Sequence, residues 1–291
     1  MNLPEKYLNS MKDMLKDDFD DYLESFNDKR LYGLRVNNLK ISTEDFLKIS
    51  PFKLKKIPWI DNGFYYEEED KPAKHPYYFA GLYYLQEPSA MTPASILPIE
   101  HGDKVLDVCA APGGKTFTMA EMMGDEGRIF ACELHEKRTG LIVKGAERLG
   151  ISCIEAVTND ARVYNEKLPM ADRVLCDVPC SGYGVIRGKP EIRYKPLSEA
   201  QRLPEIQLDI LRTACRYVKD GGLLVYSTCT VNIEENECVI EKFLAENSDF
   251  HGEEFPEDMG DFFRGKFMTA IFSKQFGGDG FFICRMRKGK K

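Results

Sequence analysis

Two cysteines of this 291-residue chain stand where reactive groups are often found in enzymes. Cys180 follows an acid and a proline in DVPCSGYG (177–184), and Cys229 ends an apolar run in VYSTCTVN (225–232). Each segment follows a stretch that predicts a buried strand, and ligands of open α/β sheets bind at the carboxyl ends of strands. We therefore expect two thiols at one edge of a sheet, both directed at the same ligand.

Two such thiols suit the methylation of carbon 5 of a pyrimidine, a ring carbon that is a poor nucleophile. A thiolate that adds to carbon 6 turns the ring into an enamine, which can attack a sulfonium methyl group. A base must then remove the proton from carbon 5 so that the thiolate can leave. Nearby cations and helix N-termini favour the thiolate, whereas apolar burial opposes it.

The segment DVCAAPGGKT (107–116) predicts the site of the methyl donor. It is not a P-loop, because Cys109 stands where that motif needs its first glycine, and no G-x-G-x-x-G is present. A single tight turn, Pro112-Gly113-Gly114, suits a ligand that has no pyrophosphate to hold. Such a ligand is S-adenosylmethionine.

Acidic residues at the next two predicted strand ends complete this donor site. Glu133 stands where an acid takes a ribose diol, and Asp160 can accept a hydrogen bond from an adenine amine. Glu133 alone would be explained as well by a helix cap or a surface charge. The loop and both acids at successive strand ends together favour S-adenosylmethionine.

Strands alternate with helices from Asp103 onward, which predicts a Rossmann-like, doubly wound α/β domain with a parallel sheet. The predicted strands are 104–110, 128–134, 151–160, 172–178, 221–229 and 280–287. The predicted helices are 114–124, 135–149 with Gly150 as its C-cap, 198–219 with an interruption at Pro204, and 233–247.

Residues 1–80 predict a small α+β extension that binds RNA, and residues 81–291 predict the catalytic domain. Helical spacing covers 3–26, strand patterns cover 31–38, 52–59 and 63–68, and a short helix is expected at 43–49. A further strand and a helix that starts near Ser89 lead into the main domain.

The net charge of −7 opposes non-specific binding to nucleic acid, but the charge is unevenly distributed. Segment 29–58 has eight basic against two acidic side chains, and segment 181–219 has eight against four. Basic surface on an acidic protein fits selective contact with a phosphate backbone, although such runs are often only solvated faces.

The nine cysteines do not predict disulfides, because their number is odd and several stand in apolar strand-like runs. No C-x-x-C pair occurs and the four histidines are scattered, so we expect no metal site. The acidic N-terminus predicts no signal peptide, and no run reaches the length of a membrane span. We expect a cytoplasmic protein that does not contact membranes.

The segments DVCAAPGGKT, DVPCSGYGVIR and VYSTCTVNIEENE resemble the signature motifs of the Nop/Sun family of RNA 5-methylcytosine methyltransferases. RVNNLK, YYLQEPSAM and DGFFICRMRK resemble further segments of that family, so the resemblance covers most of the chain. It implies an S-adenosylmethionine-dependent RNA (cytosine-5-)-methyltransferase that acts through a covalent adduct. Cys229 would be the nucleophile, and Cys180 would assist breakdown of the adduct and release of the product.

The resemblance also implies the donor-binding set. Asp177 would orient the base or the methionine end of the donor, and Lys115 would lie near the donor carboxylate. The expected donor-binding residues are Cys109, Ala110, Ala111, Pro112, Gly113, Gly114, Lys115, Glu133, Arg138, Asp160 and Asp177. For Cys109 we favour a packing role at the turn over a chemical one.

Within the family, residues 3–95 resemble the RsmF type, while 184–194 and the closing DGFFICRMRK resemble the RsmB type. Both types imply 16S ribosomal RNA as the substrate. The sequence shows neither a NusB-like nor a PUA-like domain, so the basic segments 29–58 and 181–219 are expected to supply more of the contacts that bind RNA. Residues expected to contact its backbone are Arg187, Lys189, Arg193 and Lys195.

Three alternatives stay open. The substrate could be transfer RNA; the protein could be a non-catalytic RNA-binding or ribosome-assembly factor; or it could methylate a protein or a small molecule. The intact donor loop and both cysteines speak against the second, and the third would need neither cysteine. We expect a monomer. Either Cys180 or a water would remove the proton from carbon 5.

Overall fold

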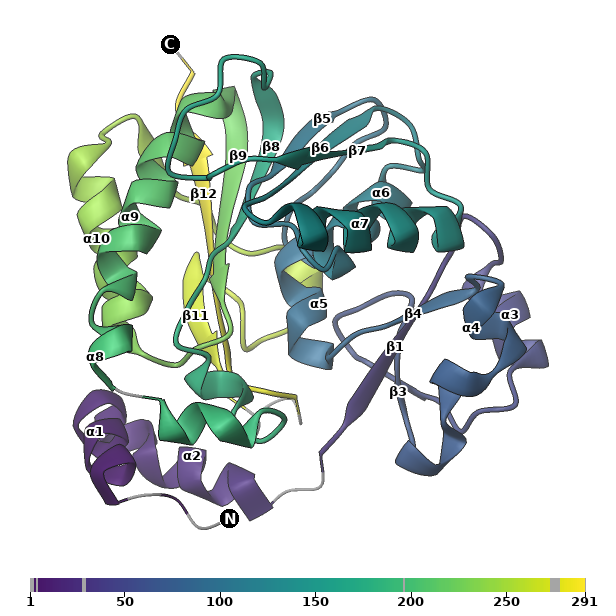
Figure 1. Cartoon of the computed structure of the whole chain (residues 1–291), viewed down its shortest axis with the longest axis horizontal. Coiled ribbons are helices and arrows are strands. Elements are labelled where there is room, and N and C mark those ends of the chain that lie inside the picture. Colours follow the sequence, from purple (N-terminus) through teal and green to yellow (C-terminus); the bar gives the residue numbers. More distant parts are fainter. Residues whose placement is uncertain (1–2, 4, 28–29, 196, 273–277, 291) are drawn as a thin grey trace.

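The computed structural model describes residues 3, 5–27, 30–195, 197–272 and 278–290, and it contains two sheets (Figure 1). The larger sheet has the strand order β10-β12-β9-β8-β5-β6-β7, and β11 pairs with β12. Its strands are β5 (Lys104–Asp107), β6 (Arg128–Glu133), β7 (Ile154–Thr158), β8 (Ala171–Asp177), β9 (Val218–Thr228), β10 (Phe250–Gly252), β11 (Met268–Ile271) and β12 (Phe281–Lys288).

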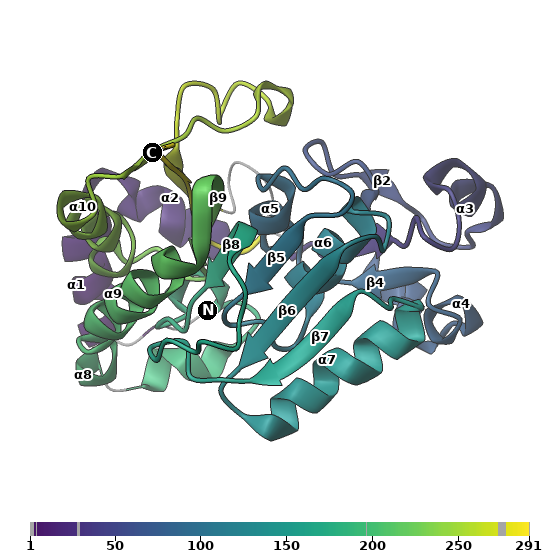
Figure 2. The same ribbon diagram turned by 90° about the horizontal axis from the view of Figure 1, so that it is seen from above.

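Helices cover both faces of this sheet (Figures 1 and 2), which confirms the predicted doubly wound α/β architecture. One face packs on α5 (Pro88–Ser95), α6 (Gly114–Met122) and α7 (Glu136–Leu149), and the other on α9 (Leu203–Ala214) and α10 (Glu237–Glu246). Side chains alternate between the two cores, so that Leu175 belongs to the first and its neighbour Cys176 to the second. Gly150 caps α7 in the left-handed conformation, as predicted.

The sheet is mixed and not entirely parallel. Strands β5, β6, β7, β8 and β9 pair in parallel, whereas β12 runs antiparallel to β9, and β10 and β11 run antiparallel to β12. Parallel strands are joined by a crossover connection, usually a helix. The chain directly before β12 instead forms the short strands β10 and β11, and both pair with it antiparallel.

The predicted helix at 198–219 is wrong in extent. The structure has a short α8 (Leu197–Ala200) followed by α9, and β9 already begins at Val218. Pro204 lies in the first turn of α9, where the missing N–H group of proline costs no hydrogen bond. The predicted interruption is present at 201–202, directly before this first turn, whereas the predicted end of the helix at 219 is wrong.

The N-terminal region has two parts that lie against different elements of the larger domain (Figure 1). Helices α1 (Glu5–Leu15) and α2 (Phe19–Glu24) pack on the segment after Cys180, where Tyr7 and Tyr22 share a buried cluster with Tyr183 and Ile186. The second part is a four-stranded antiparallel sheet of order β2-β3-β1-β4. It comprises β1 (Tyr32–Val36), β2 (Lys55–Lys56), β3 (Gly63–Tyr66) and β4 (Tyr83–Leu85), with α3 (Thr43–Ile49) and α4 (Pro76–Phe79) beside it.

A buried ion pair joins this small sheet to the larger domain. Arg35 on β1 donates from Nε and Nη2 to the two carboxylate oxygens of Glu121 on α6, each at 3.1 Å. Both side chains are almost wholly buried, and Arg35 also donates to Gln86. The pair fixes the small sheet beside the helix that follows the predicted donor loop.

We predict that Arg35→Met destabilises the protein by about 3–5 kcal/mol, because it leaves the Glu121 carboxylate buried without its cation. Urea unfolding measures this, and Arg35→Met/Glu121→Leu should recover most of the loss because it removes the uncompensated charge. Lys48→Met, which breaks an exposed ion pair with Glu44, is the control and should change little. A loss in Arg35→Met no larger than in this control would contradict the prediction.

Candidate functional site

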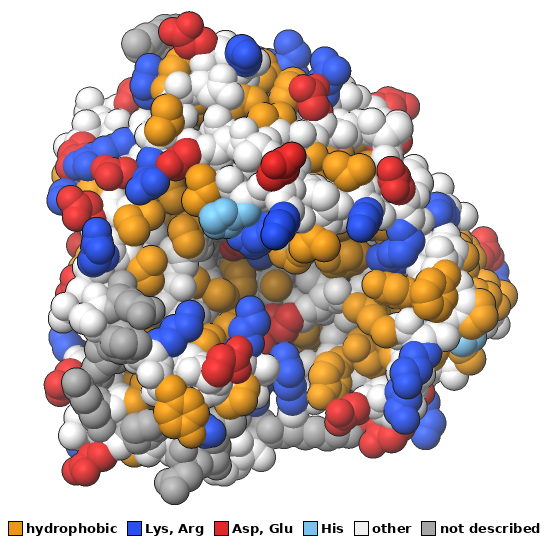
Figure 3. Space-filling view, in the orientation of Figure 1, with side chains coloured by type: hydrophobic (Ala, Val, Ile, Leu, Met, Phe, Trp, Pro, Cys, Tyr) orange, Lys and Arg blue, Asp and Glu red, His pale blue; other side chains and the backbone are white. Residues whose placement is uncertain are grey.

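A pocket opens at the carboxyl ends of the parallel strands, where the strand order reverses between β5 and β8. Its volume is about 380 Å³. The space-filling view shows a hollow in this face, with basic side chains around it and acidic ones within it (Figure 3). The loop after β5, the tips of β8 and β9, and the segments 84–90, 185–189 and 279–281 line the pocket.

The donor loop makes a turn that only glycine can make. Gly113 has a φ of 109°, in the left-handed region, and its N–H donates to the carbonyl of Ala110 at 2.7 Å. A Cβ atom there would lie 2.4 Å from the ring of Phe117. Gly113 is also the N-cap of α6 and offers no side-chain cap, so the first amides of the helix are available to an anion such as a carboxylate.

Asp107, which our sequence analysis did not single out, ends β5 at the floor of the pocket. Its Oδ2 accepts a hydrogen bond from Thr116 at 2.7 Å, while Oδ1 is buried without a hydrogen-bond partner in the described part of the chain. Burial raises the pKa of Asp107 to about 7, although the Thr116 hydrogen bond opposes the shift. An orphaned acceptor in a pocket wall suits a ligand with a donor group. The sequence did contain a signal for Asp107, because this acid stands in a predicted strand, directly before the glycine loop.

Parallel pairing of β8 with β9 brings the two cysteines together. Asp177 lies beside Ser227 in the register, and Cys180 and Cys229 follow these two strand ends. The two Sγ atoms are 3.3 Å apart. The residues that follow each cysteine are also bonded, Ser181 Oγ to Thr230 Oγ1, at 2.8 Å.

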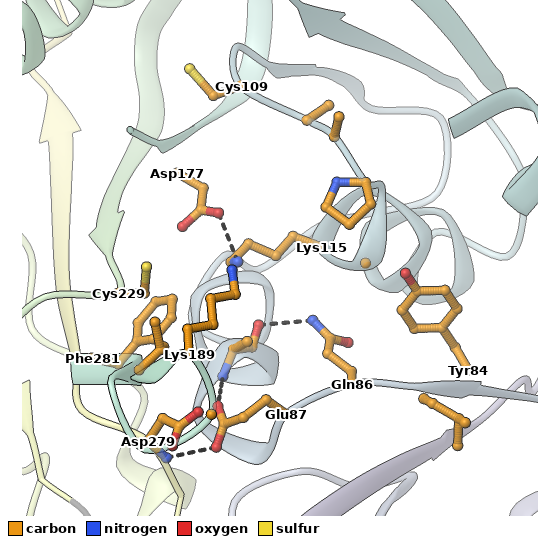
Figure 4. A pocket seen from close by; sticks show the side chains of 18 of the residues that line it. Tyr84, Gln86, Glu87, Cys109, Lys115, Asp177, Lys189, Cys229, Asp279 and Phe281 are labelled. Carbon is orange, nitrogen blue, oxygen red and sulfur yellow. Dashed lines mark hydrogen bonds and ion pairs between the residues drawn. The ribbon is translucent and has the colours of Figure 1, made fainter. Parts of the chain in front are cut away.

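The charges around the pair make the two thiols unequal. The hydrogen bond with Cys180 lowers the pKa of Cys229, and the ammonium groups of Lys115 and Lys189 (Figure 4) act in the same direction, so the pKa lies below its ordinary value despite burial and Asp177. The same hydrogen bond, with burial, raises the pKa of Cys180 well above the ordinary value. Cys229 is therefore the thiol that ionises more easily.

Lys115 and Asp177 form an ion pair inside the pocket. Lys115 Nζ lies 2.8 Å from Asp177 Oδ2 (Figure 4), and Ser227 donates to Asp177 Oδ1 at 2.8 Å. Burial lowers the pKa of Lys115, but attraction to Asp177 outweighs burial and the net shift is upward. The ammonium also lies 5.2 Å from the ring centre of Phe281, so its position is fixed from two sides.

The predicted site residues divide into two groups. The pocket is lined by Cys109, Ala110, Ala111, Pro112, Gly114, Lys115, Asp177 and Cys229. Outside its lining lie Gly113, Glu133, Arg138, Asp160 and Cys180, although Gly113 and Cys180 directly adjoin residues of the first group. Burial raises the pKa of Cys109 well above its ordinary value, which fits the packing role that we favoured for it.

Glu133 ends β6 and is tied to the donor loop through Arg138. Glu133 Oε1 accepts from the backbone N–H of His135 and from Arg138 Nη1, both at 3.1 Å, and Arg138 Nη2 donates to the carbonyl of Ala111 at 2.9 Å. Asp160 follows β7 and accepts three hydrogen bonds from Arg162, from its backbone N–H and Nε at 3.0 Å each and from its Nη2 at 2.7 Å. Its carboxylate is thus engaged with a neighbour in this structure.

Other residues that line the pocket were not predicted as site residues, although they belong to segments that resemble those of the family. Tyr84 and Glu87 come from the YYLQEPSAM stretch, and Asp279 and Phe281 come from DGFF. Glu87 Oε1 accepts from the backbone N–H of Asp279 at 2.7 Å, which joins the two segments at one wall of the pocket (Figure 4). Nothing in their order along the chain indicates this contact.

The basic residues expected on the RNA side have different surroundings. Arg187 is largely buried and donates to the carbonyls of Ser25 and Gly278, at 2.7 and 3.0 Å, so its guanidinium is occupied inside the protein. Lys189 is exposed and lines the pocket together with Arg30. Lys29, the first residue of the basic segment 29–58, lies outside the described residues.

Neither a metal-binding cluster nor a membrane-spanning helix occurs among the described residues. Within residues 3–290, apart from the undescribed positions, no group of three or more His, Cys, Asp or Glu side chains is placed to hold a metal ion. In the same part of the chain, no helix is both long and apolar enough to span a bilayer.

Comparisons with known proteins match both parts of the chain. The family model of the 16S rRNA methyltransferase RsmB/F matches residues 94–287, and that of the N-terminal domain of the 16S rRNA methyltransferase RsmF matches residues 3–88. The ribosomal RNA small subunit methyltransferase F of Escherichia coli is 36% identical over 306 residues, which covers 98% of this chain and 63% of that protein.

Two further similarities agree with these matches. The probable ribosomal RNA small subunit methyltransferase B of Bacillus subtilis is 44% identical over 212 residues, which covers 70% of this chain and 47% of that protein. The crystal structure of a methyltransferase homologue from Pyrococcus horikoshii, 27% identical, superposes over 98% of this chain and all of that one, with a TM-score of 0.80. The chain thus spans about half to two thirds of the length of these two curated relatives.

The raised pKa of Asp107 predicts a pH-dependent difference in stability. Between the unfolded value of 3.8 and the folded value of about 7, the folded protein holds a proton that the unfolded chain has lost, so wild-type stability falls as pH rises through this window. Asp107→Asn has no such proton. Its free energy of unfolding, relative to wild type, should rise by roughly 2–3 kcal/mol between pH 5 and pH 8.

Urea unfolding at the two pH values measures this difference. Asp172→Asn is the control, because the pKa of Asp172 is lowered and that carboxylate stays ionised across the window. A difference between Asp107→Asn and wild type that is the same at pH 5 and pH 8 would contradict the prediction.

Proposed function

The chain belongs to the RsmB/F family of 16S rRNA methyltransferases, and on this premise we propose that it transfers a methyl group from S-adenosylmethionine to carbon 5 of a cytosine in 16S ribosomal RNA. The observation that carries the proposal is the 3.3 Å approach of two thiols, one of them easily ionised, at a pocket that also contains the donor loop. A methyl transfer to an oxygen, or to an already nucleophilic nitrogen, would need neither thiol.

Polar groups in the pocket and at the strand ends beside it match those that S-adenosylmethionine requires. The orphaned Oδ1 of Asp107 suits the ammonium group, and the uncapped amides at the start of α6 suit the carboxylate. Glu133, held by Arg138, would accept from the ribose diol, and Asp160 would face the adenine amine after it exchanges part of its contact with Arg162. When bound, S-adenosylmethionine supplies an electrophilic methyl group.

The two cysteines and the ion pair of Lys115 with Asp177 would act on the cytosine. The Cys229 thiolate adds to carbon 6 of the base, a carbon–sulfur bond forms, and electron density moves to carbon 5 and to the polar edge of the ring. Lys115 can balance this charge, and Asp177 can accept from the exocyclic amine. Both groups are already fixed by their ion pair, so little reorganisation is needed.

Release of the product reverses the addition. Once carbon 5 is methylated, its proton must pass to a base, either an ionised Cys180 or a water, and the carbon–sulfur bond then breaks to restore the aromatic ring. Cys180 is close enough to the Cys229 sulfur to exchange a proton with it directly. The base would be reached in an unpaired or flipped state, because the reacting carbons are stacked inside a duplex.

Donor binding gives the first test. Glu133→Gln should weaken the binding of S-adenosylhomocysteine about tenfold, equivalent to about 1.4 kcal/mol, because an amide is a weaker acceptor for the ribose diol than a carboxylate. Titration calorimetry measures this. Glu136→Gln, at the exposed start of α7, is the matched control. Equal affinities in the two variants would contradict the role of Glu133.

Trapping of the covalent adduct gives the decisive test. Cys180→Ala, expressed in bacterial cells, should accumulate a protein–RNA adduct that survives a denaturing gel, because carbon 6 is attacked but release is slowed. The adduct should disappear in Cys180→Ala/Cys229→Ala, and sequencing of the trapped RNA would identify the cytosine. Trapped transfer RNA would reassign the substrate. No adduct from a folded variant that still binds S-adenosylmethionine would contradict the assigned roles of the cysteines.

A further inference from the structure

A fully buried carboxylate, that of Glu235, connects the segments that carry the two cysteines. Its Oε2 accepts from the backbone N–H of Ser181 and from Gln207 Nε2, each at 2.9 Å. Its Oε1 accepts from Asn232 Nδ2, also at 2.9 Å. One side chain thus bonds the residue next to Cys180, helix α9, and the turn that follows Cys229.

This carboxylate carries its charge without a cation. Within the described residues, no lysine, arginine or histidine lies within ion-pair distance of Glu235, and all three of its hydrogen-bond donors are neutral. A carboxylate, which only accepts, matches these three donors, whereas the NH2 group of a glutamine would face at least one of them. The same hydrogen bonds hold a negative charge in a fixed position between the two cysteine segments.

The two thiols differ in the charged groups that lie around them. The titratable groups that act on Cys180 are Cys229, Glu235, Asp177 and Tyr226, while those that act on Cys229 are Cys180, Asp177, Lys115 and Lys189. Asp177 acts on both thiols. Apart from Asp177, the full charges near Cys229 are therefore the positive charges of Lys115 and Lys189. The full charge near Cys180 is the negative charge of Glu235.

We propose that Glu235 is a positioning residue that keeps the shared proton on the Cys180 sulfur, so that Cys229 is the thiol that ionises and attacks. Negative charge next to Cys180 disfavours a second negative charge on its sulfur, and the hydrogen bond to Ser181 N–H holds that sulfur 3.3 Å from its acceptor. The catalytic meaning of this assignment rests on the proposed function. The location of the proton is a property of the protein alone.

The raised pKa of Cys180 agrees with this assignment. Its hydrogen bond to Cys229 and its burial raise the value most, and the charges of Glu235 and Asp177 add to the shift in the same direction. Without Glu235, the two sulfurs would still differ through their burial, their mutual hydrogen bond and the cations near Cys229, but one contribution to the difference would be lost. The difference in their reactivity would then shrink.

Selective alkylation tests the proposal without RNA or a methyl donor. Wild-type protein is treated with iodoacetamide between pH 6 and pH 9, and labelling of Cys180 and Cys229 is quantified by peptide mass spectrometry. In Glu235→Gln the ratio of Cys180 to Cys229 labelling should rise about three- to tenfold, since one pKa unit changes the thiolate fraction about tenfold. Glu234→Gln, an exposed neighbour with the same charge change, should leave the ratio at the wild-type value.

Glu235→Asp distinguishes an effect of the negative charge from an effect of the altered packing and hydrogen bonds. It keeps the negative charge but shortens the side chain, so the labelling ratio should stay near wild type even if stability falls. A ratio in Glu235→Gln that equals wild type, in a protein with unchanged circular dichroism, would overturn the proposal. The same follows if Glu235→Asp and Glu235→Gln raise the ratio equally, because the effect would then be structural.

A second measurement covers the case in which Glu235→Gln does not fold. In Cys229→Ser, with Glu235 intact, the rate of Cys180 alkylation should reach half of its maximum only above the ordinary thiol pKa of about 8.5, since the rate follows the thiolate fraction. A half-maximal rate at or below that pH would overturn the proposal. These results do not depend on methyl transfer, so a failure of the adduct-trapping experiment together with the expected labelling ratios would reject the proposed function and leave this inference standing.

Discussion

The parallel pairing of β8 with β9 is the constraint on which the site depends. Cys180 and Cys229 are 49 residues apart in the chain, and only the register that sets Asp177 beside Ser227 brings their sulfurs within 3.3 Å. A slip of one residue would turn every side chain of β9 to the opposite face of the sheet. The core residues of both strands, which alternate between the two helical layers, therefore protect the chemistry as well as the fold. The Ser181–Thr230 hydrogen bond holds the chain beyond the strand ends in the same alignment.

Buried charge is concentrated around this pair and is distributed unevenly. Lys115 and Asp177 neutralise one another, whereas Asp107 and Glu235 are held by neutral hydrogen-bond donors. An apolar core would make the protein more stable, so the placement of these carboxyl groups is better explained by what they do to neighbouring groups and ligands. One faces the expected ammonium group of the donor, and the other lies beside the thiol that keeps its proton. Two side chains of the same chemical type thus acquire different reactivity from their surroundings alone.

The N-terminal region supports the pocket from two directions. Helices α1 and α2 pack on the segment that follows Cys180, where Tyr22 donates to the carbonyl of Tyr183, and the small sheet is held to α6 through Arg35 and Glu121. Arg30, between these two parts, reaches the mouth of the pocket beside Lys189. The region is thus part of the structure that positions the cysteines and the donor loop. Any surface that it offers to RNA is fixed relative to the site.

The sequence by itself determined the doubly wound architecture and the glycine turn after β5, and it predicted a donor site there and two neighbouring thiols, because strand periodicity, a glycine turn and compact motifs are local properties. It did not determine the antiparallel edge at β12, the end of the predicted helix 198–219 before β9, or the occupation of Arg187 by two carbonyls, all of which depend on packing partners distant in the chain. The roles of Asp107 and Glu235 were hidden for the same reason. A carboxylate has no special chemistry until the fold buries it, and only the tertiary structure decides which polar atoms it meets there and which it is left without.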